Sequence, residues 1–393
     1  MNRFFSFSAF TSALLLGTGW GMVACAPDHS ERQFLAADTL LVNDSVALFF
    51  DPVEATRKTY RIDTLFQSMH RRGFNGAVLM AQHGHILYQK AFGYADFGKK
   101  IPLTTRTAFQ LASVSKQFTA MAVMMLKQRG KLSYEDSVQR FYPAFPYAGI
   151  TVRQLLTHRS GLPNYTYFCD QYVTDRRAHL TNQEVIRLLT LHKPAPYYLP
   201  GTHFDYSNTG YCLLAAIVEK VAGVPFGDFL GANIFKPLGM SRTLVYDQAG
   251  PVIPDRAAGY SAGRRKYDDT YLNGVVGDKG VYSTVEDLFR WELSLYTEKL
   301  VRKEVLEEAF TPAHQEPREK NYGFGWRIHT PPGGQPLVFH GGWWQGFNAY
   351  VMHGRQDHST IILLSNVTNG SLHSVQALEE ILRNPHSPLD GQR

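Results

Sequence analysis

The chain has 393 residues, of which 44% are hydrophobic and 13% aromatic, so it can bury one large core or two modest ones and lacks the composition of a disordered protein. Its formal net charge of +6 is small for this length, and no basic run with interleaved aromatic residues indicates a nucleic-acid-binding protein. Three cysteines are too few for a disulfide scaffold.

The N-terminus has the features of a secretory signal peptide. Residues 1–24 carry a single charge, Arg3, followed by an apolar stretch. Small and apolar residues before Cys25 resemble a bacterial lipobox, which predicts that Cys25 becomes the lipidated first residue of the mature chain. An ordinary cleaved signal with a chance cysteine is the alternative, because Met22 is less usual at the third upstream position. We therefore expect a bacterial envelope protein, anchored by lipid at the periplasmic or outer surface through a tether at residues 25–59.

The remaining cysteines and the histidines do not predict a metal site. An envelope compartment would permit a disulfide between Cys169 and Cys212, but we interpret both as core residues. No H-E-x-x-H motif occurs, and His83 and His85 flank a hairpin glycine. Since no phosphate-binding glycine loop is present either, we expect neither a metal nor another cofactor.

The first elements of the domain predict a helix and a β-hairpin. Apolar residues recur at helical spacing from Ile62 to Met69, and Gly73 stops the pattern. Two apolar runs follow, GAVLMAQ at 76–82 and HILYQKAFGY at 85–94. They are joined by a short HGH turn, which is typical of a hairpin.

A mostly helical lobe is expected at about residues 133–275. Thr151, Thr181 and Asn208 each stand at the head of an apolar run with helical spacing. The last of these runs ends at Gly223, which is a typical helix stop.

The C-terminal part returns to strands. Thr284 begins a capped helix, and three strand-like runs follow at 337–342, 347–354 and 359–367, before a closing helix near 372–383. Strands at both ends of the domain with helices between them predict an α+β fold. In it, both terminal segments join one antiparallel β-sheet flanked by helices, and a cleft lies at the boundary with the second, mostly helical lobe.

A serine and a lysine with helical spacing form the first candidate catalytic pair. The stretch FQLASVSKQFTA at 109–120 places Lys116 three residues after Ser113, on the same face of a long apolar helix. Partial desolvation at the helix start would disfavour the ammonium and let a neutral amine act as a base. A chance pair on a surface face is the alternative, because a chain of this length should contain about one S-x-x-K by chance.

Two other candidates are disfavoured by their surroundings. The stretch GYSAG at 259–263 matches the G-x-S-x-G pattern with Ser261 as the nucleophile, but neither a buried strand before it nor a helix after it is predicted. His158 ends a helix shortly before Gly161. A partial positive charge there would suit the helix dipole, so we interpret this histidine as structural.

A tyrosine and an asparagine at a helix start form a second candidate group. Tyr206 and Asn208 flank Ser207. A phenol near an ammonium can transfer a proton, and an amide can hold both the lysine and a substrate carbonyl. The alternative is a tyrosine that merely packs at a helix entry.

The third candidate is the glycine-rich end of a strand, FHGGWWQGF at 339–347. Glycines there would let another chain approach the strand backbone closely, as a substrate that pairs alongside requires. A strand N–H could also complete an oxyanion hole with the N–H of Ser113. A glycine-rich hairpin turn would give the same pattern.

In this order and spacing, S-V-S-K, Y-S-N and H-G-G resemble the motifs of the penicillin-recognising serine hydrolases, specifically the class C β-lactamase, DD-peptidase and related esterase group. The stretches LLTHRSGLP at 155–163, PGTHFDYSNTGY at 200–211 and GDKGVYSTVEDL at 277–288 are also similar to this group. The resemblance covers about residues 60–385, which leaves 386–393 as a tail.

The resemblance implies a role for each motif. Ser113 would attack a carbonyl and form an acyl-enzyme, while Lys116 and Tyr206 would handle its proton. Asn208 would hold the lysine and the substrate, and the backbone N–H groups of Ser113 and Trp343 would form the oxyanion hole.

The third motif departs from the β-lactamase pattern. His340 and Gly341 replace the lysine and threonine of K-T-G, which contact the carboxylate of a β-lactam, and Gly342 alone keeps the pattern. A histidine at this position is similar to DD-peptidases and esterases of the group. Trp343 and Trp344 would add apolar bulk beside the acyl site.

We therefore expect a monomeric serine hydrolase that cleaves a small amide, peptide or ester, with a D-amino-acid or peptidoglycan-type peptide as the expected substrate. His340, Gly341 and Gly342 would contact this substrate together with Asn208. A true class C-like β-lactamase is one alternative. The other is a non-catalytic module that binds muropeptides, although such a module would be expected to lose Ser113 or the lysine.

Overall fold

The computed structural model describes residues 50–246, 253–313, 320–330, 336–368, 370 and 375–384. All of them belong to the unit formed by residues 41–393. The predicted signal peptide, Cys25, most of the predicted tether and the C-terminal tail lie outside the described residues. Within the described ranges, no helix combines the length and the apolar composition needed to cross a membrane.

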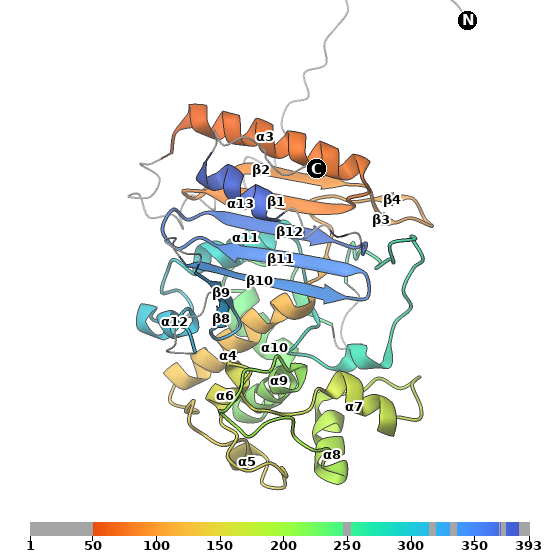
Figure 1. Ribbon diagram of the computed structural model, residues 1–393, viewed down its shortest axis with the longest axis vertical. Helices are drawn as coiled ribbons and strands as arrows, with labels where there is room; N and C mark the ends of the chain where they lie inside the picture. The colour runs from red at the N-terminus through yellow and green to blue at the C-terminus, as the bar shows by residue number, and fades with distance from the viewer. Residues whose placement is uncertain are drawn as a thin grey trace, which may run out of the picture. The chain divides into compact units, whose positions relative to one another are not determined.

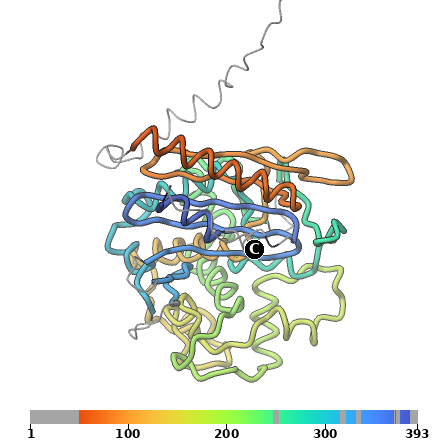
Figure 2. Tube along the Cα trace, turned by 45° about the horizontal axis from the view of Figure 1, so that its top comes forward, coloured from red at the N-terminus to blue at the C-terminus, as the bar shows by residue number. Residues whose placement is uncertain are grey.

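A seven-stranded antiparallel sheet forms the centre of the domain, with strand order β2-β1-β12-β11-β10-β9-β8. Its strands are β1 (Gly76–Gln82), β2 (His85–Phe92), β8 (Lys320–Tyr322), β9 (Arg327–His329), β10 (Leu337–Trp344), β11 (Phe347–His353) and β12 (Thr360–Ser365). The N-terminal hairpin joins the C-terminal strands where β1 pairs with β12, with Gly76 opposite Ser365. Figure 2 shows these orange and blue strands side by side. The prediction that both ends of the domain share one antiparallel sheet is confirmed.

Helices α3 (Pro52–Arg71) and α13 (Val375–Arg383) cover one face of this sheet (Figure 1). Phe66 of α3 is fully buried there, with its ring 5.4 Å from Phe74 and 6.0 Å from Phe92 between centroids. Alternate residues of the apolar strands reach this core, since successive side chains of a strand point to opposite faces.

Helix α3 begins earlier than the domain start expected at residue 60. The carboxylate of Asp51 accepts the N–H groups of Val53 and Glu54, and Pro52 occupies the first turn, so the helix has a strong N-terminal cap. The buried positions of α3 lie mostly between Ile62 and Met69, and this is the only part that the apolar spacing revealed.

The other face of the sheet supports the helical lobe. Helix α11 (Val285–Ser294) packs on β1 and β12 there. The apolar helix α9 (Asn208–Ala222) is the centre of the lobe and contacts five other helices, α4 (Ser115–Gln128), α6 (Val152–Leu156), α7 (Tyr165–Tyr172), α8 (Asn182–His192) and α10 (Phe226–Leu230). Figure 1 shows the helices of the lobe together beyond β8 and β10. The other helices on this side of the sheet are α5 (Val138–Phe141), η3 (Gly231–Phe235) and α12 (Lys303–Ala309).

The predicted helix boundaries agree with observed caps. The hydroxyls of Thr151, Thr181 and Thr284 accept an N–H group three residues ahead, in α6, α8 and α11. Gly223 adopts the left-handed conformation, with φ of 71°, at the end of α9.

Short elements that the sequence did not predict connect the sheet to the lobe. A small sheet has the order β5-β7-β6. Its strands are β5 (Phe109–Gln110), β6 (Leu244–Val245) and β7 (Val281–Ser283); β3 (Tyr94–Asp96) and β4 (Ile101–Pro102) form a separate pair, and η2 (Ala112–Val114) and η4 (Tyr271–Gly274) are short helical turns. Because β5 leads directly into η2, the small sheet fixes where Ser113 emerges.

Candidate active site

Ser113 lies in the tight turn η2, between β5 and α4, and not inside the long helix as the sequence suggested. The turn is held at its start, where the N–H of Leu111 donates to Val281 O at 2.9 Å. Ala112 has a φ of 48°, a left-handed conformation that costs a residue with a side chain about 1–3 kcal/mol. A strained turn therefore presents the Ser113 hydroxyl at the N-terminus of α4.

Lys116 is fully buried, and its side-chain nitrogen lies beside this hydroxyl. Its Nζ lies 3.2 Å from Ser113 Oγ, 2.9 Å from Asn208 Oδ1 and 2.9 Å from the backbone oxygen of Asp278. The last two atoms only accept hydrogen bonds, whereas a hydroxyl also donates. An ammonium can thus donate to all three, and a neutral amine can donate to two of them and accept the Ser113 proton. The proton can pass between lysine and serine without movement of the site.

Tyr206 completes the group that the first two motifs predicted. Its ring centroid lies 5.0 Å from Lys116 Nζ. The residues that follow hold it there, because Ser207 is extended and α9 begins at Asn208. The Oη atom of Tyr206 is buried and has no hydrogen-bond partner among the described residues. This phenol is therefore available to a reacting group.

Strand β10 packs directly against the turn that carries Ser113. A Cβ atom on Gly342 would lie 2.4 Å from Leu111 O and 2.9 Å from Ser113 N, both of them backbone atoms. The sequence suggested that glycine makes room there for a substrate. At Gly342 the approaching backbone is instead the protein's own turn, and only glycine permits that contact.

One edge of β10 is open beside Ser113. Strand β9 pairs with Leu337, Val338 and Phe339, and no described strand pairs with that edge over residues 340–344. Trp343 belongs to this stretch, and 57% of its surface is exposed. The part of β10 next to Ser113 thus has backbone groups that a ligand can use.

The His340 ring is buried and engaged within the protein. Its Nδ1 lies 2.7 Å from the backbone oxygen of Gly341, which only accepts, so Nδ1 carries the proton. Its Nε2, 2.9 Å from Tyr322 Oη, then accepts from the phenol. Burial, together with the positive charges of Arg327 and Lys116, lowers the pKa of His340 well below its usual range. The neutral ring has no free nitrogen for a ligand, so contact between substrate and residues 340–342 stays a prediction for the backbone alone.

Arg327 is a site residue that sequence reasoning missed. It is exposed on β9, and its guanidinium carbon lies 5.1 Å from the Tyr206 ring centroid. No acidic side chain pairs with it among the residues that the structure describes. A single arginine in a three-residue strand shows no periodic signal in the sequence. It adds a positive charge at the mouth of the site.

Ser261, the competing nucleophile, lies in a tight surface turn. Its Oγ accepts the N–H of Arg265 at 3.1 Å, and Tyr260 bridges to Lys266 across the turn. Neither a preceding buried strand nor a following helix is present at this position, so it lacks the elbow that the G-x-S-x-G pattern requires.

Cys169 on α7 and Cys212 on α9 are free, buried thiols. Burial raises the pKa of Cys169 to about 12 and that of Cys212 well above its usual range. Both are therefore unreactive core residues, as the sequence indicated.

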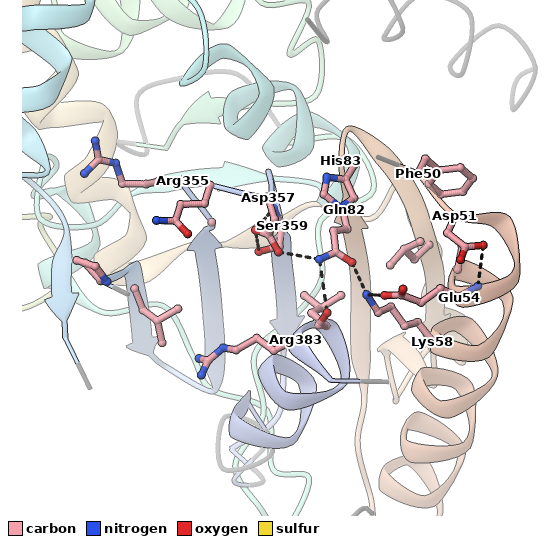
Figure 3. A pocket seen from close by; sticks show the side chains of 17 residues that line it. Phe50, Asp51, Glu54, Lys58, Gln82, His83, Arg355, Asp357, Ser359 and Arg383 are labelled. Carbon is pink, nitrogen blue, oxygen red and sulfur yellow. Dashed lines mark hydrogen bonds and ion pairs between the residues drawn. The ribbon is translucent and has the colours of Figure 1, made fainter. Parts of the chain in front are cut away.

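A cavity of about 730 Å³ lies away from the predicted catalytic residues, between the start of α3, the start of β10, the segment after β11 and the end of α13 (Figure 3). Several of its polar side chains bond to one another. Lys58 Nζ donates to Gln82 Oε1 at 2.7 Å, and Gln82 Nε2 donates to Asp357 Oδ2 at 2.7 Å. None of the predicted site residues lines this cavity.

Comparison with known proteins places this geometry in a family. The family model described as Beta-lactamase matches residues 62–382. Penicillin-binding protein 4* of Bacillus subtilis (strain 168) is 38% identical over 328 residues, which cover 79% of this chain and 72% of that protein. The structure of an octameric penicillin-binding protein homologue from Pyrococcus abyssi is 30% identical, with a TM-score of 0.71, and the match covers 83% of this chain and 77% of that one.

D-amino acid amidase from Ochrobactrum anthropi SV3 is a further structural neighbour, 25% identical with a TM-score of 0.69 over 81% of this chain and 97% of that one. These similarities extend over nearly all of the described domain and confirm the predicted α+β fold. The chain therefore belongs to the β-lactamase family of penicillin-recognising serine hydrolases, and it is an enzyme of that family.

Proposed function

We propose that this enzyme forms an acyl-enzyme at Ser113 and cleaves an amide or peptide bond in a D-amino-acid substrate of the peptidoglycan type. The observation that carries the proposal is the contact of Lys116 Nζ with Ser113 Oγ at 3.2 Å, in a buried site where Asn208 and a backbone oxygen also accept from the lysine. A relative named as a penicillin-binding protein and a neighbour named as a D-amino acid amidase support this substrate class.

The proposed acylation follows from these contacts. Lys116 takes the hydroxyl proton as Ser113 Oγ bonds to the substrate carbonyl carbon. The carbon–nitrogen bond then breaks, and the leaving nitrogen takes a proton from Tyr206, which the ammonium of Lys116 replaces. Water next attacks the acyl carbon and gives a proton to Lys116. Ser113 Oγ then leaves the acyl carbon and takes that proton from Lys116. Both serine and lysine return to their starting states.

The open edge of β10 would bind the substrate backbone in this scheme. A peptide that pairs with residues 340–344 runs past the Ser113 hydroxyl, since Gly342 adjoins the Ser113 backbone. The N–H groups of Ser113 and Trp343 would then donate to the oxygen that becomes negative during attack.

Arg327 narrows the proposed substrate to one with a carboxylate near the scissile bond. Its exposed guanidinium lies beside the Tyr206 ring and has no acidic partner in the described part of the chain. A planar guanidinium binds a carboxylate through two parallel hydrogen bonds. A peptide with a free C-terminus supplies such a group, whereas a peptide amide does not.

We also propose where this enzyme is located and in which oligomeric state it acts. Lipid anchoring at Cys25 in the cell envelope agrees with the envelope role that the name penicillin-binding protein suggests for a relative. A monomer is the expected state, although one structural neighbour is octameric. Light scattering on the protein lacking residues 1–25, and radiolabelled palmitate with Cys25→Ser, test these two points.

A labelling experiment tests the nucleophile. Protein lacking residues 1–25 is treated with a fluorescent phosphonate and, separately, with a fluorescent penicillin, alongside Ser113→Ala and Ser261→Ala. We expect labelling to disappear only in Ser113→Ala, with the adduct mass located on Ser113. Rapid hydrolysis of a chromogenic cephalosporin would instead favour a true β-lactamase, and no labelling by either probe would favour a non-catalytic binding module.

A pair of substrates tests the carboxylate. Two acylated D-alanyl-D-alanine peptides are compared, one with a free C-terminus and one with a C-terminal amide. We expect Arg327→Gln to raise KM about tenfold or more for the free acid and less than about twofold for the amide, because only the acid loses an ion pair. Arg187→Gln, which removes an exposed arginine paired with Glu184 on α8, is the matched control and should change neither value. Equal losses on both peptides would refute the assignment.

A further inference from the structure

His158, which lies outside the three motifs, binds the backbone on both sides of Tyr206. Its backbone oxygen accepts the N–H of Asp205 at 2.8 Å, and its ring Nδ1 accepts the N–H of Ser207 at 3.2 Å. The one residue between these two hydrogen bonds is Tyr206. His158 itself is held in the left-handed conformation, with φ of 56°, just after α6.

The His158 ring also packs against the Tyr206 side chain. The ring centroids of His158 and Tyr206 lie 4.2 Å apart, and only 1% of His158 is exposed. The same Tyr206 ring has Lys116 Nζ 5.0 Å from its centroid and the Arg327 guanidinium carbon at 5.1 Å. Movement of His158 would therefore displace the phenol relative to the lysine.

The hydrogen bond from Ser207 requires that Nδ1 carry no proton. Burial, followed by the positive charge of Lys116, lowers the pKa of His158 well below its usual range. The titratable and charged groups around the ring are Lys116, Arg327, His340, Tyr206, Tyr211 and Tyr322. None of them is an acid that would stabilise a cation. The sequence suggested a partial positive charge on His158, at the end of α6. Burial favours the neutral ring more strongly than the helix dipole favours a charged one, so His158 does not carry this charge.

We propose that His158 is a positioning residue that acts through Tyr206 and holds its phenol beside Lys116. This inference rests on the proposed function, because it matters only where Tyr206 transfers a proton. The proposed role has two separate parts. His158 supplies an acceptor for the Ser207 N–H, and it places a flat ring against Tyr206. A residue that supplied only core packing would need the ring and not the acceptor.

Two substitutions separate these components. His158→Asn keeps an acceptor at the δ position and tolerates the left-handed backbone, while His158→Phe keeps a flat ring and removes the acceptor. The matched control is His192→Phe, which changes a histidine stacked on Tyr172 at 3.8 Å, on helix α8. Acylation by the phosphonate and turnover of the D-alanyl peptide are measured for each, with thermal unfolding as a check on folding.

We expect His158→Phe to lower kcat about a hundredfold with KM within about threefold of wild type, since a shift of about 1 Å in a catalytic group has an effect of this size. His158→Asn should keep kcat within about tenfold of wild type, because the acceptor that fixes the loop is retained, and His192→Phe should match wild type. Equal activity of His158→Phe and wild type would overturn the inference, as would equal losses in the Asn and Phe variants.

A spectroscopic reading does not depend on turnover. Nitrogen-15 NMR of the wild-type protein should show His158 as the neutral form protonated at Nε2 from pH 5 to pH 9, and His158→Phe should show faster amide exchange at Ser207. A protonated His158 at pH 6 in the wild-type protein would overturn the inference even if His158→Phe failed to fold. Unchanged amide exchange at Ser207 in a folded His158→Phe variant would also overturn it. Wild-type protein that showed this signature but no acylation would refute the proposed function alone.

Discussion

Replacing Gly342 with alanine tests the contact between β10 and the nucleophile turn. The added Cβ would lie 2.4 Å from Leu111 O, whereas ordinary contacts begin at 3.4 Å. Two backbone segments must therefore separate by about 1 Å, a displacement that can cost about a hundredfold in rate when it moves a catalytic group. Because Ser113 N lies 2.9 Å from the same Cβ, the separation would move the N–H proposed for the oxyanion hole.

The assay for Gly342→Ala is the second-order rate of acylation by the phosphonate, measured beside thermal unfolding. We expect a loss of about a hundredfold in this rate, and overpacking should lower the free energy of unfolding by about 1–3 kcal/mol. Gly231→Ala is the control, because its backbone is helical, with φ of −55°, and its Cβ would meet nothing within 4 Å. Acylation of Gly342→Ala within threefold of wild type would refute the idea that this glycine sets the position of the turn.

Three further changes probe other parts of the molecule. Tyr206→Phe keeps the ring but removes the buried, unpartnered phenol oxygen, so kcat should fall by about 10²- to 10⁴-fold with little change in KM, as steady-state kinetics would show. Burial raises the pKa of the Glu292 carboxyl well above its usual range, so the folded state keeps this group protonated. The free energy of unfolding therefore falls as the pH rises above 4.5, the pKa of this carboxyl in the unfolded chain. Glu292→Gln can keep a hydrogen bond to His353, and melting curves should show a gain over wild type at pH 9 that is absent at pH 4. Phe66→Ala should lower the free energy of unfolding by about 3–5 kcal/mol in urea while the acylation rate of the folded fraction stays unchanged, because Phe66 packs on the face of the sheet away from Ser113.

Local signals were sufficient for most of the regular elements. A helix cap depends on residues within one turn, so Thr151, Thr181 and Thr284 identified three helix starts correctly. The β1–β2 hairpin and the last three strands are long apolar runs bounded by turns, and they were predicted for the same reason. The start of α3 was missed because its first half is mostly exposed and shows no apolar spacing.

Contacts between distant segments account for what the sequence could not predict. The small β5-β7-β6 sheet joins strands of two or three residues from three separate regions, each too short to show a period. The left-handed Ala112, the contact of Gly342 with Leu111 and the position of Arg327 beside Tyr206 likewise come from segments that are far apart in the sequence. The motifs predicted Ser113, Lys116, Tyr206 and Asn208, which the structure brings together, but their geometry comes from these long-range contacts.

The pairing of β1 with β12 makes closure of the central sheet depend on the last strand of the chain. Strand β1 is buried along its whole length, yet one of its edges has no partner until the last strand of the sheet has been made. Pairing of such distant segments is slow, and an apolar strand with an open edge is prone to aggregation in the meantime. A chain that stops before Thr360 would contain every proposed catalytic residue and still lack the strand that joins the two ends of its sheet. We therefore expect the sheet to close only after residues 360–365 have been synthesised.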